Sequence, residues 1–332
     1  MKIAFFEIKD WEKDYLTKGL TGHELRFSEK ALSPDNVKEC KDCDIVSVFI
    51  YSKVDKQVLK SLPKLKLVAT RSTGFDHIDL KECKKRKIIV CSVPFYGENT
   101  VAEHTFGLIL SLSRNIHKAY VRTLKQDFTI EGLKGFDLKG KTLGIIGAGR
   151  IGLHVIRAAK SFGMDVLVYD TKEDNFLSEV LGFNYVSFED LLGMSDIISL
   201  HIPDNEFTHH IINSKNIKLI KKGAILINTS RGGIVETEAL IRALDEGILS
   251  GVGLDVLEGE ELIKEEEQLL SDPKKASAFG ELIRSHTLLK KDNVVFTPHI
   301  AFYSQEALER ILDTTLRNIK VFLLHKPENV VK

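Results

Sequence analysis

Residues 142–152 read TLGIIGAGRIG and are the most informative stretch of this chain about its fold. An apolar stretch typical of a buried strand leads into Gly147, Gly149 and Gly152, spaced G-x-G-x-x-G, and the helical pattern RIGLHVIRAAKSF follows. In this context Gly147 permits a tight turn, Gly149 lets the backbone approach a pyrophosphate, and Gly152 allows close packing of the helix on the strand. The free amides at the helix start face the phosphates. The stretch therefore predicts a dinucleotide site at one edge of a parallel α/β sheet.

The next strand, DVLVYD, ends in Asp170, 18 residues after Gly152. An acidic residue near this distance accepts hydrogen bonds from the adenosine ribose hydroxyls, and its charge would repel the 2′-phosphate of NADP. The residues that follow, TKED, supply one Lys and no Arg to neutralise a phosphate. The predicted cofactor is therefore NAD rather than NADP.

Short apolar strands alternate with helical segments on both sides of this motif. Before it come KIAFFEI, DIVSVFI, LKLVATRS and KIIVCSV, and after it come DVLVYD, NYVSF, DIISLHIP, AILINTS, GVGLDVL and NVVFTPHI. Such alternation is typical of parallel sheets covered by helices on both faces. Ser187 is expected to cap the helix that begins at SFED. The fold class predicted is therefore α/β, with two doubly wound parallel-sheet domains.

Three longer segments set the predicted domain limits. A single long helix is expected from about Asn99 to Leu124, a polar, loop-like insertion from about 261 to 292, and a final amphipathic helix over 304–325. The long and final helices are the expected crossings between domains. We therefore predict a discontinuous first domain, residues 1–99 and 300–332, with a second domain of residues 100–299 inserted into it.

The composition excludes several classes of protein. The 332 residues suffice for about two domains, and 47 Lys and Arg balance 47 Asp and Glu, which disfavours nucleic-acid and membrane partners. With 43% apolar and 28% charged residues, a folded protein is expected. The N-terminus reads as a strand rather than a signal peptide, so a cytoplasmic location is expected.

Cys40 and Cys43 form a C-x-x-C pair, which in some proteins binds zinc or performs redox chemistry. No second pair follows at metal-binding spacing, and Cys43 precedes a buried strand where a small apolar residue is wanted. No metal is therefore predicted. Reduced thiols are typical of cytosolic proteins.

Three strand ends after the glycine motif carry residues suited to chemistry. Arg231 follows AILINTS, and a guanidinium binds a carboxylate through two hydrogen bonds. Asp255, Glu258 and Glu260 follow the next strand, and His299 follows NVVFTP. Histidine exchanges protons near neutral pH, and a neighbouring carboxylate favours its charged form. A carboxylate clamp, a proton donor and a partner for that donor are what hydride transfer to a 2-keto acid requires.

The other histidines have structural interpretations. His104 lies in the apolar long helix and His201 at a buried strand end, and both are expected to be hydrogen-bonded structural residues. His209 and His210, in a polar turn, are expected to be solvated.

The chain resembles the D-isomer-specific 2-hydroxyacid dehydrogenase family, and within it the fermentative D-lactate dehydrogenases, over nearly its whole length. The resemblance is carried by STGFDHIDL, VPFYGENTVAEHTFGLILSLSRNIHKAYVRT, FTIEGLKGFDLKGKTLGIIGAGRIG, SDIISLHIP, INTSRGGIVETEALIRAL, GLDVLEGE and FTPHIAFYSQEAL. It implies a flavodoxin-like substrate domain and a Rossmann NAD-binding domain.

The resemblance also implies roles for individual residues. His299 corresponds to the acid/base, Glu260 (not Glu258) to its partner, and Arg231 to the group that binds the substrate carboxylate and carbonyl. The residues implied for substrate binding are Thr73, Gly74, Tyr96, Arg231 and Phe302. At the position of Phe302, several relatives carry a tyrosine. Those implied for cofactor binding are Gly147, Gly149, Arg150, Ile151, Gly152, Asp170, Ile202, Pro203, Thr208, Thr229, Ser230, Arg231 and Asp255.

The function implied is the reversible reduction of pyruvate to D-lactate with NADH, by a homodimer or larger homo-oligomer whose interface includes the long helix. The stripe around Phe106, Leu108, Ile109 and Leu112 is itself interpreted as core. Two alternatives stay open. The substrate could be another D-2-hydroxy acid, branched or aromatic, or glyoxylate or hydroxypyruvate. The protein could also be a non-enzymatic, corepressor-like NAD sensor, although the sequence shows neither a disordered extension nor a basic face.

Overall fold

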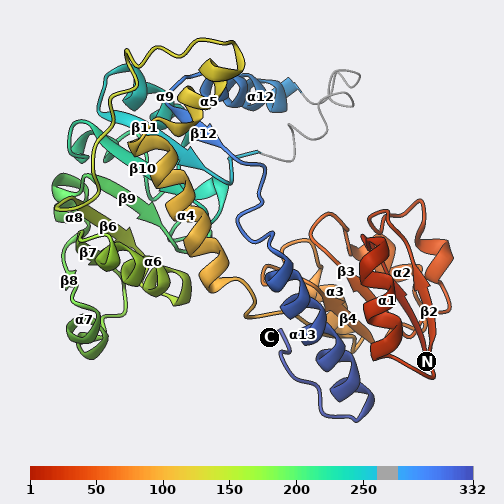
Figure 1. Cartoon of the computed structure of the whole chain (residues 1–332). Helices are drawn as coiled ribbons and strands as arrows, with labels where there is room; N and C mark the ends of the chain where they lie inside the picture. The colour runs from red at the N-terminus through yellow and green to blue at the C-terminus, as the bar shows by residue number, and fades with distance from the viewer. Residues whose placement is uncertain (260–275, 332) are drawn as a thin grey trace. The chain divides into compact units, whose positions relative to one another are not determined.

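The computed structural model describes residues 1–259 and 276–331. The chain divides into two compact units, Met1–Tyr96 with Ser304–Lys332 and Gly97–Tyr303 (Figure 1). No helix in the described part of the chain combines the length and apolar character that a bilayer crossing needs.

The first unit is built on a five-stranded parallel sheet in the order β2-β1-β3-β4-β5. Its strands are β1 (Lys2–Phe5), β2 (Glu24–Phe27), β3 (Ile45–Val48), β4 (Leu67–Thr70) and β5 (Ile89–Cys91). Its helices are α1 (Asp10–Gly19), the short 3₁₀ helix η1 (Val37–Cys40), α2 (Lys56–Lys60), α3 (Leu80–Lys85) and α13 (Gln305–Leu323). Side chains of β1 alternate between the faces: Ile3 and Phe5 pack with α1 and α13, whereas Ala4 packs with η1, α2 and α3. The C-terminal helix thus completes this unit.

The second unit is built on a seven-stranded parallel sheet in the order β12-β11-β10-β9-β6-β7-β8. Its strands are β6 (Thr142–Ile146), β7 (Asp165–Tyr169), β8 (Asn184–Tyr185), β9 (Ile197–Leu200), β10 (Ala224–Asn228), β11 (Leu249–Leu254) and β12 (Val294–Phe296). Its α-helices are α4 (Glu98–Ser113), α5 (Ile116–Leu124), α6 (Arg150–Ser161), α7 (Asn175–Leu181), α8 (Phe188–Met194), α9 (Thr237–Asp245) and α12 (Ala276–Leu289), and its 3₁₀ helices are η2 (Ile217–Leu219) and η3 (Gly232–Ile234). Counted from β6, the sheet has the Rossmann order, with one further strand at the β12 edge.

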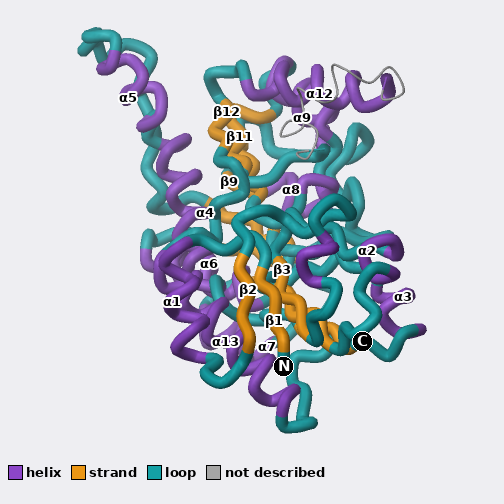
Figure 2. The backbone as a smooth tube through the Cα atoms, turned by 90° about the vertical axis from the view of Figure 1, so that its right-hand side faces the viewer, coloured by secondary structure: helices purple, strands orange, loops and turns teal. Residues whose placement is uncertain are grey.

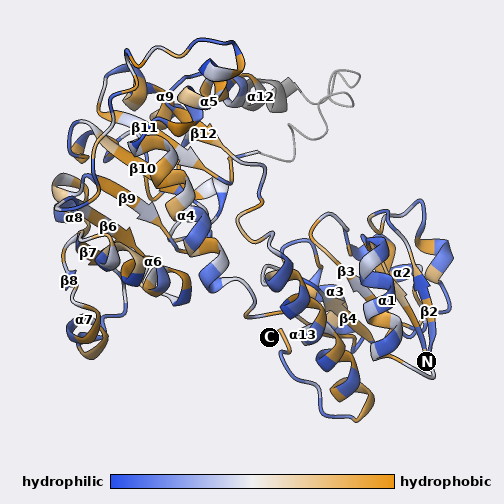
Figure 3. Cartoon of the chain, in the orientation of Figure 1, coloured by the Kyte–Doolittle hydropathy of each residue, from blue (hydrophilic) through white to orange (hydrophobic). Residues whose placement is uncertain are grey.

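Helices cover both faces of the second sheet. One buried cluster contains Phe106 of α4 and Val155 of α6, and the opposite cluster contains Leu191 of α8, Leu240 of α9 and Leu288 of α12. Figure 3 shows the strands coloured mainly as hydrophobic and the outer helix faces as hydrophilic. The predicted fold class is therefore confirmed in both units. Ser187 caps α8 as expected, since its hydroxyl accepts from the Asp190 amide at 3.1 Å.

The single long helix predicted for residues 99–124 is wrong. It is two helices, α4 and α5, separated at Asn115, whose φ of 51° is left-handed. The segment 133–136 causes the break: Asn115 donates to the Leu133 and Lys134 carbonyls, and the Ser113 carbonyl accepts from the Phe136 amide at 2.8 Å. A contact with a segment about twenty residues further along thus overrides the local helical pattern.

The loop-like insertion predicted for residues 261–292 is also corrected in part. Residues 276–289 form α12, and Leu288 is buried against the sheet. The many charged residues around this stretch make its helical pattern difficult to recognise in the sequence. Residues 260–275 lie outside the described part of the chain.

The C-x-x-C pair lies in the core of the first unit. Cys40 and Cys43 are both buried and free of disulfide bonds. Burial raises the pKa of Cys40 to about 12 and also raises the pKa of Cys43. Both side chains are therefore protonated thiols that pack as small apolar groups, in line with the structural interpretation of this pair.

Candidate active site

Six strands of the second sheet end at the same level. Strand pairing places Tyr169, Ile146, Leu200, Asn228, Leu254 and Phe296 in one row across the sheet. The residues that directly follow these strand ends are, in the same order, Asp170, Gly147, His201, Thr229, Asp255 and Thr297. The glycine motif and the segments that carry Arg231 and His299 therefore all leave the sheet at its carboxyl edge, where open α/β sheets bind ligands.

The glycine loop has the geometry of a dinucleotide site. Gly147 has a φ of +97°, and a Cβ there would lie 2.6 Å from the His201 carbonyl oxygen. A Cβ on Gly152 would lie 2.1 Å from the Gly147 carbonyl oxygen, so the helix and the loop touch. A Cβ on Gly149, the N-cap of α6, would meet no atom within 4 Å, so the backbone here is open to a phosphate.

Asp170 ties the end of β7 to this loop. One carboxylate oxygen accepts from the Ala148 amide at 2.7 Å, and the other accepts from the Lys172 amide at 2.9 Å. Each oxygen can accept a further hydrogen bond. The carboxylate is therefore fixed at the loop and still able to accept from ribose hydroxyls.

The segment after β9 carries the residues predicted for the adenine side. The Thr208 hydroxyl donates to the Pro203 carbonyl at 2.5 Å and accepts from the Asn205 amide at 2.9 Å, so Thr208 closes the turn that follows Ile202. His201, at the start of this segment, bonds the Ser199 hydroxyl, and burial lowers its pKa to about 3. It is therefore a neutral structural histidine.

Asn228 positions Arg231. Its buried side chain accepts from the Ser230 amide at 3.0 Å and donates to the Arg231 carbonyl at 2.8 Å. The Arg231 guanidinium donates to the Ser230 carbonyl and is exposed at the sheet edge. The sequence pattern did not single out Asn228, although an Asn between a buried strand and a turn is typical of a residue that bonds nearby backbone.

Asp255 holds the loop that carries His299. Its carboxylate is 1% exposed and accepts from the Thr297 hydroxyl at 2.5 Å, the Ile300 amide at 2.9 Å and the Ala301 amide at 2.8 Å. The His299 amide in turn donates to the Asp255 carbonyl at 2.8 Å. Residues 297–301 are therefore held around one buried carboxylate, and His299 lies in the middle of the bend with a left-handed φ of 58°. Contact of Asp255 with the nicotinamide stays a prediction.

Helix α4 supports the same strand ends from one face of the sheet. The Thr105 hydroxyl contacts the Thr229 hydroxyl at 3.1 Å, and His104 Nε2 contacts the Thr297 hydroxyl at 2.9 Å. Because the Thr297 proton is directed to Asp255, His104 must be the donor in its contact. His104 is thus the hydrogen-bonded structural residue that the sequence predicted.

Phe302 follows the His299 bend. The two rings meet edge to face, with centroids 6.4 Å apart, so Phe302 forms an apolar wall beside the imidazole. Glu260, the predicted partner of His299, lies outside the described residues. Glu258 bonds His210 and Thr237 instead, which corrects the expectation that His210 is solvated.

In the first unit, the predicted substrate-binding residues Thr73 and Gly74 follow β4. The Thr73 hydroxyl donates to the Val93 carbonyl at 2.8 Å, and the Ser72 hydroxyl donates to the Gly74 carbonyl at 2.6 Å. In the described chain the Thr73 and Gly74 amides have no acceptor. Two adjacent amides without an acceptor, at the carboxyl end of a strand, suit an anionic ligand such as a carboxylate.

Arg71, which the sequence pattern did not single out, anchors this loop. It is 2% exposed, and its guanidinium donates to the carbonyls of Phe6 at 2.6 Å and Glu7 at 3.0 Å. Tyr96, also predicted to bind substrate, is partly buried at the end of this unit, and its carbonyl accepts from Arg310 at 2.6 Å.

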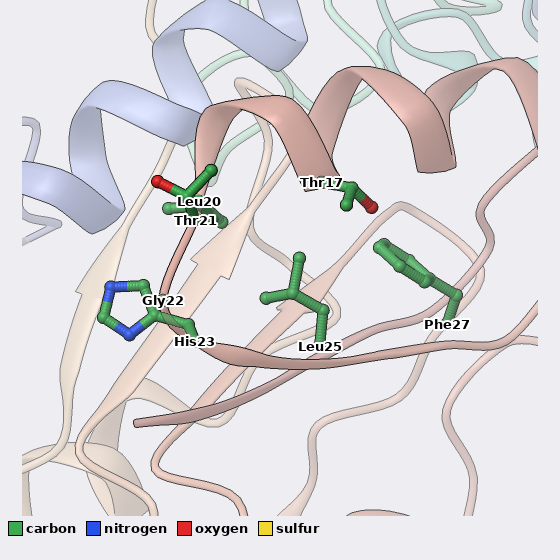
Figure 4. A pocket seen from close by; sticks show the side chains of 7 residues that line it. All are labelled: Thr17, Leu20, Thr21, Gly22, His23, Leu25 and Phe27. Carbon is green, nitrogen blue, oxygen red and sulfur yellow. The ribbon is translucent and has the colours of Figure 1, made fainter.

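A surface hollow of about 390 Å³ lies elsewhere, between α1 and β2 of the first unit. Figure 4 shows its lining of Thr17, Leu20, Thr21, Gly22, His23, Leu25 and Phe27. None of these is a predicted site residue. The hollow is lined by apolar side chains, two threonines and one histidine and contains no arginine or lysine, so the strand edge described above is the better candidate.

Comparison with known proteins gives one family. Residues 106–301 match the model of the NAD binding domain of D-isomer specific 2-hydroxyacid dehydrogenases. D-lactate dehydrogenase of Escherichia coli is 36% identical, covering 96% of each chain, and glyoxylate reductase of Thermococcus litoralis is 38% identical, covering 89% of this chain and 85% of that protein. The structure of D-lactate dehydrogenase from Aquifex aeolicus complexed with NAD and lactic acid is 39% identical, with a TM-score of 0.86 and coverage of 98% and 96%.

The matched family domain spans the glycine loop, Arg231 and His299, so family and geometry point to the same strand edge. The prediction of NAD as the cofactor is confirmed. This chain belongs to the D-isomer specific 2-hydroxyacid dehydrogenase family and is an NAD-dependent oxidoreductase.

Proposed function

We propose that this protein is a D-lactate dehydrogenase, which reversibly reduces pyruvate to D-lactate. The observation that carries the proposal is the placement of Arg231 and His299 after strands β10 and β12, at the sheet edge that also carries the dinucleotide loop. The D-lactate dehydrogenases among the relatives favour pyruvate as the substrate. Phe302 also favours a small substrate, because its ring occupies the space beside the imidazole.

In this proposal each group has one task. The bound cofactor supplies a hydride to, or accepts it from, C2 of the substrate. Arg231 binds the substrate carboxylate and polarises the carbonyl through its guanidinium. The His299 imidazolium donates a proton to the carbonyl oxygen during reduction and takes it back during oxidation. Glu260 is proposed to orient that imidazolium.

The remaining residues predicted from the sequence are proposed to bind the substrate or the cofactor. The Thr73 and Gly74 amides suit the substrate carboxylate, and Tyr96 and Phe302 are proposed to line the substrate site. On the cofactor side, the open backbone at Gly149 and the amides of Arg150 and Ile151 suit the pyrophosphate, and the other cofactor contacts implied by the family motifs are proposed with them.

The test is a panel of 2-keto acids with NADH: pyruvate, phenylpyruvate, 2-ketoisocaproate, glyoxylate and hydroxypyruvate. We expect the highest kcat/KM with pyruvate and D-lactate as the product. The second candidate, a glyoxylate or hydroxypyruvate reductase, is favoured by the 38% identity to glyoxylate reductase and would show the highest kcat/KM with those acids. Turnover of none of the five would contradict both candidates and favour the NAD sensor.

Replacing Asp170 by Ala is expected to reduce the preference for NADH over NADPH about tenfold or more. Hydrogen bonds to a charged group are worth about 1.5–3 kcal/mol, and the variant removes both the ribose acceptor and the charge that repels a 2′-phosphate. The measurement is kcat/KM for each cofactor at saturating keto acid. Asp165→Ala, at the exposed start of the same strand, is the control and should keep the parent ratio. An unchanged ratio in Asp170→Ala would remove this assignment.

We propose that the protein is a homodimer, joined through residues 116–130, here called the apolar arm. Its large side chains are unusually exposed: Ile116 52%, Tyr120 63%, Val121 51%, Leu124 66%, Phe128 77% and Ile130 86%. Figure 2 shows α5 standing off from the sheet of its own unit. Apolar surface gathered in this way favours a partner, and a second copy is the partner that the chain itself supplies. The Phe106 stripe of α4 is buried within its own unit, as the core interpretation predicted, so the arm is the available surface.

Replacing Tyr120 and Leu124 together by Glu is expected to give a monomer, because two charges would enter the proposed interface. Light scattering after size exclusion should then give the chain mass of 37.4 kDa, and twice that mass for the parent protein. Phe176→Glu, at an equally exposed site on α7, is the matched control and should leave the dimer intact. A monomeric parent protein would contradict the proposal.

A further inference from the structure

The turn that begins at Arg231 is enclosed on two sides, by backbone near Gly232 and by side chains near Gly233. A Cβ on Gly232 would lie 2.2 Å from the Leu257 carbonyl oxygen and 2.4 Å from the Glu258 amide nitrogen. A Cβ on Gly233 would lie 2.2 Å from Asp204 Oδ2. The segments that follow β9 and β11 therefore contact the turn after β10 directly, and the two glycines are what allows this approach.

One side-chain pair joins the two outer segments. His210, after β9, places Nε2 at 2.6 Å from Glu258 Oε1, after β11. The His210 amide also donates to the Gly233 carbonyl at 2.8 Å. The other oxygen of Glu258 accepts from the Thr237 amide at 3.1 Å and from its hydroxyl at 2.8 Å. The side-chain pair thus joins the start of α9 at Thr237 to the segment whose backbone bonds the turn at Gly233.

The side chains of the His210–Glu258 pair are partly shielded from solvent. The Glu258 side chain is 20% exposed and that of His210 34% exposed. Burial acts to raise the pKa of Glu258, but hydrogen bonds from His210 and Thr237 outweigh it and hold this pKa below its ordinary value. The His209 ring stacks on that of His210, with centroids 4.2 Å apart, and contacts Asp204. The Glu258 carboxylate is therefore charged and partly withdrawn from solvent, where hydrogen bonds to it contribute more than at a fully exposed site.

We propose that His210 and Glu258 are positioning residues for Arg231: by joining the segments on either side, they hold the glycine turn so that the guanidinium is presented in a fixed place to the substrate carboxylate. This inference rests on the proposed role of Arg231 as the carboxylate clamp. Neither residue takes part in proton transfer. Their loss is therefore felt mainly in the binding of the keto acid.

The experiment compares His210→Leu, Glu258→Gln and the double variant with the parent enzyme. We expect amide hydrogen exchange to be about fivefold faster in peptides covering 229–235. We also expect KM for the keto acid to rise about fivefold at saturating NADH, with kcat changed less than about twofold. The double variant should match the single ones, because either change breaks the same pair. His210→Gln keeps a donor and should recover part of the parent KM.

The matched control is Lys221→Gln, which breaks an ion pair of similar exposure with Asp196 near the amino ends of the same strands. It should lower the melting temperature without changing exchange over 229–235 or KM. Faster exchange with an unchanged KM would overturn the positioning role and leave the pair a stabilising contact only. Unchanged amide hydrogen exchange over 229–235 in the His210 and Glu258 variants would also overturn the positioning role.

The keto acid used is the one that the parent enzyme reduces best. A failure of pyruvate turnover then contradicts the proposed function, whereas the exchange readout still decides whether the pair holds the turn. A fall in kcat equal to the rise in KM would also overturn the proposal, since a loosened clamp alone does not predict it. NADH affinity, measured by fluorescence, should change less than KM for the keto acid, because the glycine loop that suits the pyrophosphate is untouched.

Discussion

Replacing His299 by Asn is expected to lower kcat for keto-acid reduction by about a hundredfold or more. General acid catalysis by a positioned side chain contributes about 10²- to 10⁴-fold, and Asn cannot donate a proton in this way. Asn is preferred to Ala here because His299 has a left-handed φ of 58°, which Asn tolerates better than other non-glycine residues. The loss of kcat then reports the missing proton donor rather than strain in the bend.

The measurement is steady-state kcat with pyruvate and NADH, together with NADH affinity from fluorescence. NADH affinity should stay within about twofold, since the glycine loop is untouched. His23→Asn, a histidine of the first unit remote in sequence from every predicted site residue, should keep the parent kcat. Parent-like turnover by His299→Asn would contradict the assignment of the acid/base.

Replacing Asp255 by Ala is expected to destabilise the protein by about 3 kcal/mol or more and to lower kcat at least about tenfold. The change leaves the Thr297 hydroxyl and the Ile300 and Ala301 amides without their acceptor, and each unsatisfied buried group costs about 1–3 kcal/mol. The bend that carries His299 then loses its anchor, and a small misplacement of the imidazole reduces the rate of proton transfer.

Urea unfolding measures the first effect and kcat well below the melting temperature measures the second. The matched control is Asp196→Ala, another carboxylate, which accepts from the Thr142 amide at 2.9 Å and pairs with Lys221 near the amino ends of the strands. It should lower stability and preserve kcat. If Asp255→Ala lost stability but kept kcat, the carboxylate would hold the fold without positioning His299.

The features that could be predicted from the sequence depend on residues close together in the chain. The G-x-G-x-x-G spacing predicted the glycine loop and the helix after it. The buried strands that are followed by Arg231 or His299 predicted the sheet edge at which the site lies. What could not be predicted depends on side chains that meet across long separations. Asp255 bonds residues 42–46 positions later, and His210 meets Glu258 48 positions later. The break at Asn115 likewise depends on carbonyls at Leu133 and Lys134, and no local pattern reports such contacts.

The placement of α13 in the first unit has a consequence for biosynthesis. Leu312, Leu316 and Ile319 are buried against the sheet of the first unit, whose strands all precede the second unit in the chain, and the Asn318 side chain donates to the Ser92 carbonyl. The first unit therefore cannot close its core until α13, which follows the second unit in the chain, has left the ribosome, whereas the second unit is synthesised without interruption. During that interval the face of the five-stranded sheet that α1 and α13 share is covered by α1 alone, so the apolar side chains that α13 later buries stay exposed to solvent.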